Sequence, residues 1–255
     1  MKTIYSEQHI YQNSKSELAG GQLIKPYECP ERMEYILHEI NSRNLGEVLK
    51  PNATDLKIVK KVHDSNYVEF LEKAWIEWKN EGYQGEAIPT VWPSRSMNSK
   101  QIPNHIEGKL GYYCLANETS ISQGSVKGAY EAGRVVLTAT DMLEKEKSLF
   151  ALCRPPGHHA SRDQYGGYCF FNNIAIAAER LIEKGAKKIF ILDIDFHHGN
   201  GTQAIFYQRS DIYFASLHGH PKEAFPHFLG YANEKGNGAG EGYNINYPMK
   251  PGTPY

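Results

Sequence analysis

The sequence predicts an α/β fold in which helices cover both faces of a mainly parallel β-sheet. Short apolar runs, typical of buried strands, alternate along the chain with segments of helical periodicity. Polar residues follow directly on two of these runs, as they do where a parallel sheet carries a site at the carboxyl ends of its strands. The 255 residues contain no internal repeat and no low-complexity linker, so we expect one domain.

The helices are indicated by apolar side chains that recur on one stripe, and the strands by short apolar runs. Pro51 ends the second strand, because proline cannot continue a sheet ladder. Asn200 or Thr202 could cap the last helix. The strands are expected at residues 2–5, 48–50, 148–153, 189–192, 212–217 and 243–247, and the helices at 31–44, 64–79, 125–147, 171–184 and 202–207.

Two regions depart from this alternation. Residues 80–123 are rich in glycine and proline and are too long for an ordinary connection, so they predict an inserted functional or contact region. Residues 219–243 read as a loop rich in glycine, histidine and proline.

Composition excludes several classes of protein. The formal net charge is −1 and the pI about 6.8, so no nucleic-acid or anionic-membrane partner is expected. The N-terminus has no apolar core of signal-peptide length, and no stretch approaches about 18 apolar residues. The four cysteines show no CxxC spacing, which favours a reduced, cytoplasmic protein.

The first of the two polar turns follows the apolar run 189–192. Asp193, Asp195 and His197 are spaced by two, so they would point to one side of the sheet if the strand conformation persisted. Converging buried charges need a partner, and a bound cation is the simplest one. The competing interpretation is an Asp cap or turn beside a hydrogen-bonded His. Four titratable residues in six positions favour a metal site.

The second polar turn is Arg-Pro-Pro-Gly-His-His-Ala at 154–160. Two prolines and a glycine restrict its backbone, so His158 and His159 would be held in one pose. One could act as general base and acid while the other stays charged. Alone, this turn would be read as two surface histidines or part of another metal site. Beside the carboxylate turn, the catalytic reading is favoured.

Glycines and aromatics follow at 166–171, Gly-Gly-Tyr-Cys-Phe-Phe. The glycines allow close backbone approach and the aromatic rings suit a narrow apolar tunnel. Ordinary packing of the next helix explains Phe170 and Phe171 equally well.

These motifs, together with Asp-Ile-Asp-Phe-His-His-Gly-Asn-Gly-Thr-Gln at 193–203 and Ser-Leu-His at 216–218, resemble the zinc-dependent histone deacetylase family. Within that family, the stretches 106–114 and 223–231 are most similar to bacterial acetylpolyamine amidohydrolases. The resemblance covers the whole chain and implies an arginase-like α/β fold with a mainly parallel sheet. It also implies hydrolysis of acetylated polyamines or related small acetylated amines. The alternatives are a lysine deacetylase acting on proteins or peptides and a catalytically incompetent chain that keeps the fold. A manganese ureohydrolase on the same fold is a remoter rival, because such enzymes use an Asp-rich two-metal site.

The resemblance also assigns roles to residues of both turns. Asp195 and His197 would bind zinc, with iron(II) as the alternative metal. His158 and His159 would be the catalytic pair, with His159 as general base and acid. Asp193 would orient His158, and Asn200 would be the partner of His159.

Further residues are implied by the resemblance alone. One structural potassium ion would be surrounded by Asp193, Asp195, His197, Ser216 and Leu217, and a second cation by Phe206, Arg209, Ile212 and Tyr243. The acyl channel would be lined by Gly167, Tyr168 and Phe225. Glu107 and Glu118 would meet a distal ammonium group, and the insertion at 80–123 would form a homodimer contact.

The sequence departs from the family pattern at its end. The family's third metal ligand, a later Asp, and its catalytic Tyr in a Gly-Gly-Tyr motif have no counterpart: no Asp follows Tyr247, and Tyr255 lacks the glycines. We therefore expect a chain truncated at its C-terminus, with a gap in the sheet between the strand before His158 and the strand before Asp195. We also expect the chain alone to be poorly folded or inactive.

Overall fold

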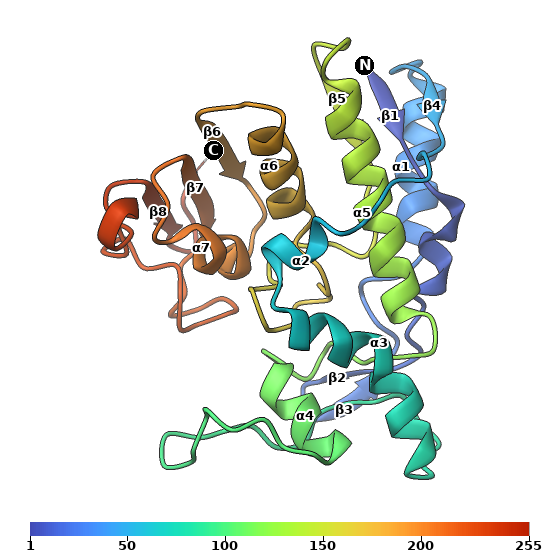
Figure 1. Cartoon of the computed structure of the whole chain (residues 1–255), viewed down its shortest axis with the longest axis vertical. Helices are drawn as coiled ribbons and strands as arrows, with labels where there is room; N and C mark the ends of the chain where they lie inside the picture. Colours follow the sequence, from blue (N-terminus) through green and yellow to red (C-terminus); the bar gives the residue numbers. More distant parts are fainter. Residues whose placement is uncertain (255) are drawn as a thin grey trace.

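The structure, a computed structural model, describes residues 1–254; Tyr255 lies outside the described residues. Its strands form two parallel three-stranded sheets and one antiparallel hairpin (Figure 1). The first sheet has the order β4 (Val48–Leu49), β1 (Lys2–Ile4), β5 (Leu149–Ala151), and the second has the order β6 (Ile189–Asp193), β7 (Ile212–Gly219), β8 (Asn244–Met249). The hairpin pairs β2 (Glu17–Ala19) with β3 (Gln22–Ile24).

The parallel pairing is as predicted, and so is the gap between the strands that precede the two polar turns. Within residues 1–254, β5 pairs with β1 alone and β6 pairs with β7 alone. The two turns at the ends of these strands therefore belong to different sheets.

The helices match the predicted segments closely, with ends set by local chemistry. The Asp64 carboxylate accepts a hydrogen bond from Asn66 N and caps α3 (Ser65–Asn80), and Asn172 Oδ1 accepts from Ala175 N and caps α6 (Asn173–Glu183). Two predictions were wrong: the helix predicted at 125–147 ends at residue 142, and the one predicted at 202–207 begins at Asn200 without a side-chain cap. The helices are α1 (Glu31–Ser42), α2 (Val59–Val62), α3 (Ser65–Asn80), α4 (Ile106–Tyr113), α5 (Ser125–Met142), α6 (Asn173–Glu183) and α7 (Asn200–Phe206), with 3-10 turns η1 (Glu7–Tyr11) and η2 (Gly238–Gly240).

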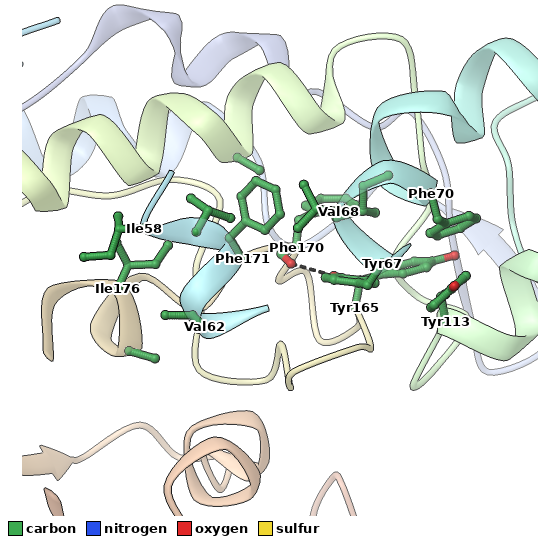
Figure 2. Close-up of a cluster of buried hydrophobic side chains, with 14 of the residues drawn as sticks. Ile58, Val62, Tyr67, Val68, Phe70, Tyr113, Tyr165, Phe170, Phe171 and Ile176 are labelled. Carbon is green, nitrogen blue, oxygen red and sulfur yellow. Dashed lines mark hydrogen bonds between the residues drawn. The ribbon is translucent and has the colours of Figure 1, made fainter. Parts of the chain in front are cut away.

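The largest apolar core lies where α3, α5 and α6 meet the segment between β5 and α6. Tyr67 and Phe170 are fully buried there, and the Tyr67 hydroxyl donates to Phe170 O at 2.6 Å (Figure 2). Phe171 packs beside them against Tyr130 of α5, at 5.0 Å between ring centroids. Phe170 and Phe171 are therefore core residues, as the packing interpretation held, and they fix the segment that follows the histidine turn.

The strand β6 is not buried as its apolar run predicted. Ile191 is 5% exposed, whereas Phe190 and Leu192 on the opposite side are 61% and 54% exposed. The strand β6 is the end strand of its sheet, and no further strand pairs with its outer edge among the described residues.

The insertion at 80–123 contains α4, which the sequence analysis missed. Residues 93–105 are exposed throughout and extend away from the body of the molecule (Figure 1). Ala87 and Ile121 form an antiparallel bridge near the two ends of the insertion. Within residues 1–254, no helix combines the length and the hydropathy that a membrane crossing requires.

Candidate active site

The tandem histidines lie in the turn after β5, and each imidazole has its own partner. His158 Nδ1 lies 2.9 Å from Asp193 Oδ2, and His159 Nδ1 lies 2.6 Å from Asn200 Oδ1. Asn200 Nδ2 donates to His159 O, which orients the amide. Since the amide oxygen only accepts, His159 Nδ1 carries a proton and Nε2 is free to accept one. The structure thus brings together all four residues that were predicted to act in catalysis.

The carboxylate turn follows β6, but its geometry is not the predicted one. The strand ends at Asp193, so the side chains at 193, 195 and 197 are not aligned by strand alternation. The turn closes on itself instead: Asp193 Oδ1 accepts from Asp195 N at 3.1 Å, and Asp195 Oδ1 accepts from His197 N at 2.8 Å. Asp195 Oδ1 and His197 Nδ1 lie 3.5 Å apart. Asp195 and His197 are therefore still neighbours.

Helix α7 connects the two turns. Its first N–H groups, Gly201 N and Thr202 N, donate to His158 O at 3.0 and 3.1 Å. A Cβ atom at Gly201 would lie 2.2 Å from Ala160 O, so only glycine permits this approach. The His159 ring lies 6.1 Å from the His197 ring as a result of this packing. These backbone contacts, together with the His158–Asp193 and His159–Asn200 side-chain pairs, join the two halves of the cluster without a shared sheet.

Burial and neighbouring charges set the protonation states. Burial, with a smaller effect of the charge on His158, lowers the pKa of His159 well below its ordinary value, so this imidazole is neutral at pH 7. The hydrogen bond from the His197 side chain holds the pKa of Asp195 well below its usual range, so this carboxylate is ionised. The cluster therefore combines a neutral base with an anionic oxygen donor.

The donor set partly fits a divalent cation. A carboxylate and an imidazole at Asp195 and His197 are ligand types that zinc accepts, and their side chains keep 54% and 44% exposure. Within residues 1–254, no group of three or more His, Cys, Asp and Glu side chains is arranged to hold a metal ion. These two residues would supply two of the three protein ligands that a catalytic zinc site usually has.

The His159 ring packs against Phe225 and Gly167, and one cleft reaches the neighbouring His158. The Phe225 ring stands perpendicular to the His159 ring at 4.9 Å, and a Cβ atom at Gly167 would lie 2.1 Å from His159 Cδ2. Tyr168 follows Gly167 with a φ of 65°. A cleft of about 570 Å³ lies in the gap between the two sheets and reaches His158 and Asp195. Of the residues predicted to line the acyl channel, Phe225 and Gly167 lie beside His159, and Tyr168 is the next residue in the chain.

The residues assigned to cation sites lie in two groups. Asp193 is opposite Ser216 in the β6–β7 ladder, next to Leu217, and the Ser216 hydroxyl lies 3.0 Å from His198 Nδ1 and 2.9 Å from His218 Nδ1. The other group gathers where α7 ends and β7 and β8 begin. Phe206 O accepts a hydrogen bond there from Arg209 N. Tyr243 O accepts one from Phe214 N of β7, the strand that begins at Ile212.

The two glutamates of the insertion are in different places. Glu118 Oε1 accepts from Gly167 N at 2.5 Å, so this carboxylate belongs to the wall of the site. Glu107 lies in the first turn of α4, where its carboxylate approaches His105 Nδ1 at 3.8 Å. The contacts of Glu107 are thus within the insertion and do not reach the histidine cluster.

Sequence reasoning missed several polar residues around the cluster. Glu17, 3% exposed, accepts a hydrogen bond from the Tyr168 hydroxyl at 2.9 Å, and Thr119 Oγ1 accepts from Tyr168 N at 2.8 Å. His198 and His218 are fully buried. The motif at 193–203 contains His198, but Glu17 and Thr119 stand in no local pattern that could have revealed them.

The chain is similar along its length to proteins of known family. A family model described as the histone deacetylase domain matches residues 26–254. The chain is 55% identical over its full length to acetylpolyamine amidohydrolase of Mycoplana ramosa and covers 75% of that protein. It is 45% identical to acetylpolyamine amidohydrolase 1 of Pseudomonas aeruginosa, with 99% of this chain and 74% of that one covered.

A solved structure shows the same fold. The crystal structure of acetylpolyamine aminohydrolase from Burkholderia pseudomallei superposes with a TM-score of 0.90 at 32% identity, covering 98% of this chain and 72% of that one. The expected arginase- and deacetylase-like α/β fold is thereby confirmed.

Proposed function

Because this chain belongs to the histone deacetylase family, we propose that it hydrolyses the amide bond of acetylated polyamines or of related small acetylated amines. The observation that carries the proposal is the placement of a neutral, buried His159 between Asn200 and the Asp195–His197 pair. The substrate class comes from the names of relatives that match along the whole chain.

In this proposal His159 moves the proton. Its free Nε2 accepts a proton from the attacking water and later passes a proton to the leaving amine. Asn200 keeps the imidazole in the required tautomer. His158, hydrogen-bonded to the Asp193 carboxylate, supplies positive charge beside the reacting acyl group when protonated.

Asp195 and His197 would hold the metal ion, zinc or alternatively iron(II). A zinc ion bound there would lower the pKa of a water molecule and polarise the acyl oxygen. The walls formed by Gly167, Tyr168 and Phe225 would exclude bulk water and orient the acetyl group. Glu118 stands near enough to this wall to favour a cationic amine, whereas Glu107 would have to act from another surface.

Several finer predictions stay part of the proposal. We propose that residues 1–255 form a single catalytic domain with an insertion at 80–123. We also propose that the protein is a homodimer in which this insertion makes the contact. The location would be the cytoplasm. Two structural cation sites would use the groups around Ser216 and around Phe206 described above. The gathering of these residues at common strand ends supports the two cation sites.

The test is release of acetate from N-acetylputrescine by the zinc-loaded protein, compared with an acetyl-lysine peptide. The His159→Ala variant is expected to lose about 10²- to 10⁴-fold in kcat/KM and to keep its affinity for zinc. Asp195→Ala is expected to weaken zinc binding itself, measured by calorimetry. His38→Ala, an exposed change on α1, is the control.

Three other results of these experiments would each point to a different interpretation. Preference for the peptide would indicate a lysine deacetylase. Binding of acetylated amine without acetate release would indicate a non-catalytic member of the family. Wild-type turnover in both site variants would show that the site assignment is wrong.

A further inference from the structure

We propose that Glu86, in the insertion, is a positioning residue that fixes Tyr168 in the wall of the acyl channel. The inference rests on the proposed function, because that function gives Tyr168 its role. Glu86 touches neither the histidine pair nor the Asp195–His197 turn. Its effect reaches Tyr168 through two segments that are far apart in the sequence.

The Glu86 carboxylate is saturated with donors from these two segments. Lys15 N donates to Oε1 and Oε2 at 2.9 and 3.0 Å, and Ser16 N donates to Oε2 at 3.1 Å. The hydroxyls of Ser16 and Ser120 each donate to Oε2 at 3.2 Å. One carboxylate thus ties residues 15–16 to residue 120, and hydrogen bonds of this charge-assisted kind are the strong ones.

Both tied segments then bind Tyr168 or its neighbour. Immediately after Ser16, the buried Glu17 carboxylate accepts from the Tyr168 hydroxyl at 2.9 Å. Immediately before Ser120, Thr119 Oγ1 accepts from Tyr168 N and Glu118 Oε1 accepts from Gly167 N. The hydroxyl end and the backbone end of Tyr168 are therefore held by different segments, which meet at Glu86.

Glu86 is itself fixed by the residue that follows it. Ala87 and Ile121 exchange two backbone hydrogen bonds of 2.9 Å, and both residues are buried. This bridge holds Glu86 and Ser120 side by side at the base of the insertion. A flexible glutamate on the surface would not restrict the positions of the segments that it binds. Glu86 does restrict them, because it is anchored beside a buried bridge.

The wall needs such a constraint because its backbone conformation is unfavourable. Tyr168 has a φ of 65° and Gly167 a φ of 55°, both in the left-handed region. For a non-glycine residue this region is sparsely populated and persists only where the surroundings determine it. If the surroundings relaxed, Tyr168 would leave this conformation and the channel beside His159 would change shape.

The experiment uses Glu86→Ala, Glu86→Gln and a matched control, Glu81→Ala, an exposed residue of the same region. The first readout is hydrogen–deuterium exchange of peptides that contain the Gly167 and Tyr168 amides. Glu86→Ala should speed this exchange by about tenfold. Glu86→Gln keeps one acceptor oxygen and should give an intermediate value, and the control should match the wild type.

The second readout is kinetics with N-acetylputrescine. Glu86→Ala should raise KM by about tenfold and change kcat much less, because the reacting groups stay in place. Unchanged exchange at 167–168 would overturn the proposal, as would faster exchange with an unchanged KM. If Glu86→Ala loses its fold, Glu86→Gln decides by the same criteria. A wild type that releases no acetate, the outcome already expected for the chain alone, would bear on the proposed function and not on Glu86, and the exchange data alone would then decide whether Glu86 holds Tyr168.

Discussion

At the scale of single residues, the two adjacent imidazoles are distinguished by their partners. His158 meets a carboxylate and His159 meets an amide. The carboxylate places a negative charge beside the first ring, whereas the neutral amide oxygen fixes a tautomer of the second ring without adding charge. Adjacent histidines of identical chemistry thereby become suited to different tasks.

This difference predicts the effect of Asn200→Ala. Without the amide oxygen, the His159 ring loses its orienting partner, and kcat should fall by about 10- to 100-fold with little change in KM. The measurement is steady-state kinetics with N-acetylputrescine. The control is Asn66→Ala at the start of α3, outside the cluster. An undiminished kcat would show that Asn200 does not orient the base.

The side-chain pairings that could be predicted from sequence are those whose partners lie in marked motifs. His158, Asp193, His159 and Asn200 all stand in the two polar turns, and the structure pairs them as expected. Glu17 and Glu86 could not be predicted, because they act across 151 and about 70 residues of sequence and stand in no pattern of their own.

At the scale of elements, the start of α7 depends on one small residue. A Cβ at Gly201 would lie 2.2 Å from Ala160 O, which is backbone and cannot turn away. Gly201→Ala should therefore cost about 1–3 kcal/mol in the free energy of unfolding and lower activity by displacing Asn200. The control is Gly85→Ala, where a Cβ meets nothing within 4 Å. Chemical denaturation of both variants checks the prediction, and equal stabilities would contradict it.

The buried histidine between α2 and α3 predicts a pH dependence of stability. Burial lowers the pKa of His63 to about 4, and its Nε2 accepts from Asn172 N, the cap of α6. The unfolded chain binds a proton here below about pH 6.5, but the folded chain does not until about pH 4. The free energy of unfolding should therefore fall as the pH drops through this window, by on the order of 3 kcal/mol from His63 alone.

The variant that tests this is His63→Gln, which keeps an acceptor in place of the imidazole nitrogen. Urea unfolding at several pH values should show a slope between pH 6.5 and 4 that is reduced by about 1.4 kcal/mol per pH unit. A slope equal to that of the wild type would mean that His63 takes up its proton in the folded chain as readily as in the unfolded one.

Elements with a clean apolar period were predictable, and short or glycine-containing ones were not. The paired glycines at 20 and 21, both with positive φ, were a hairpin signal, but strands of three residues are too short to show alternation. Helix α4 contains Gly108 and Gly111, which lower helix propensity. At Gly111 a Cβ would overlap Val91 O, so this glycine serves close packing and does not mark a turn.

At the scale of the whole molecule, the end strand of the second sheet exposes an apolar surface. Phe190, Leu192, Ile194 and Phe196 are 61%, 54%, 75% and 67% exposed along this strand and the turn after it. Exposed apolar side chains at the end strand of a sheet favour association. We expect the chain to self-associate at high concentration and expect Phe190→Glu to reduce this association, measured by light scattering.

The control for this prediction is Phe228→Glu, which changes a residue that is 87% exposed in the loop before β8. Equal effects of the two substitutions would show that general charge, and not the surface on β6, governs solubility. The gap between the sheets was foreseen from the resemblance, but the exposed side of β6 was not, because an apolar run alone does not reveal which of its sides is covered.

The division of the two polar turns between separate sheets has a thermodynamic consequence. Any ligand that touches both turns also links one half of the molecule to the other, and it does so only when the halves are correctly aligned. Binding of such a ligand and correct alignment of the two halves must then favour each other. A saturating inhibitor that contacts both turns should therefore raise the melting temperature of the protein and slow its proteolysis between residues 160 and 190. An inhibitor that contacts one turn alone would leave the alignment of the halves unchanged.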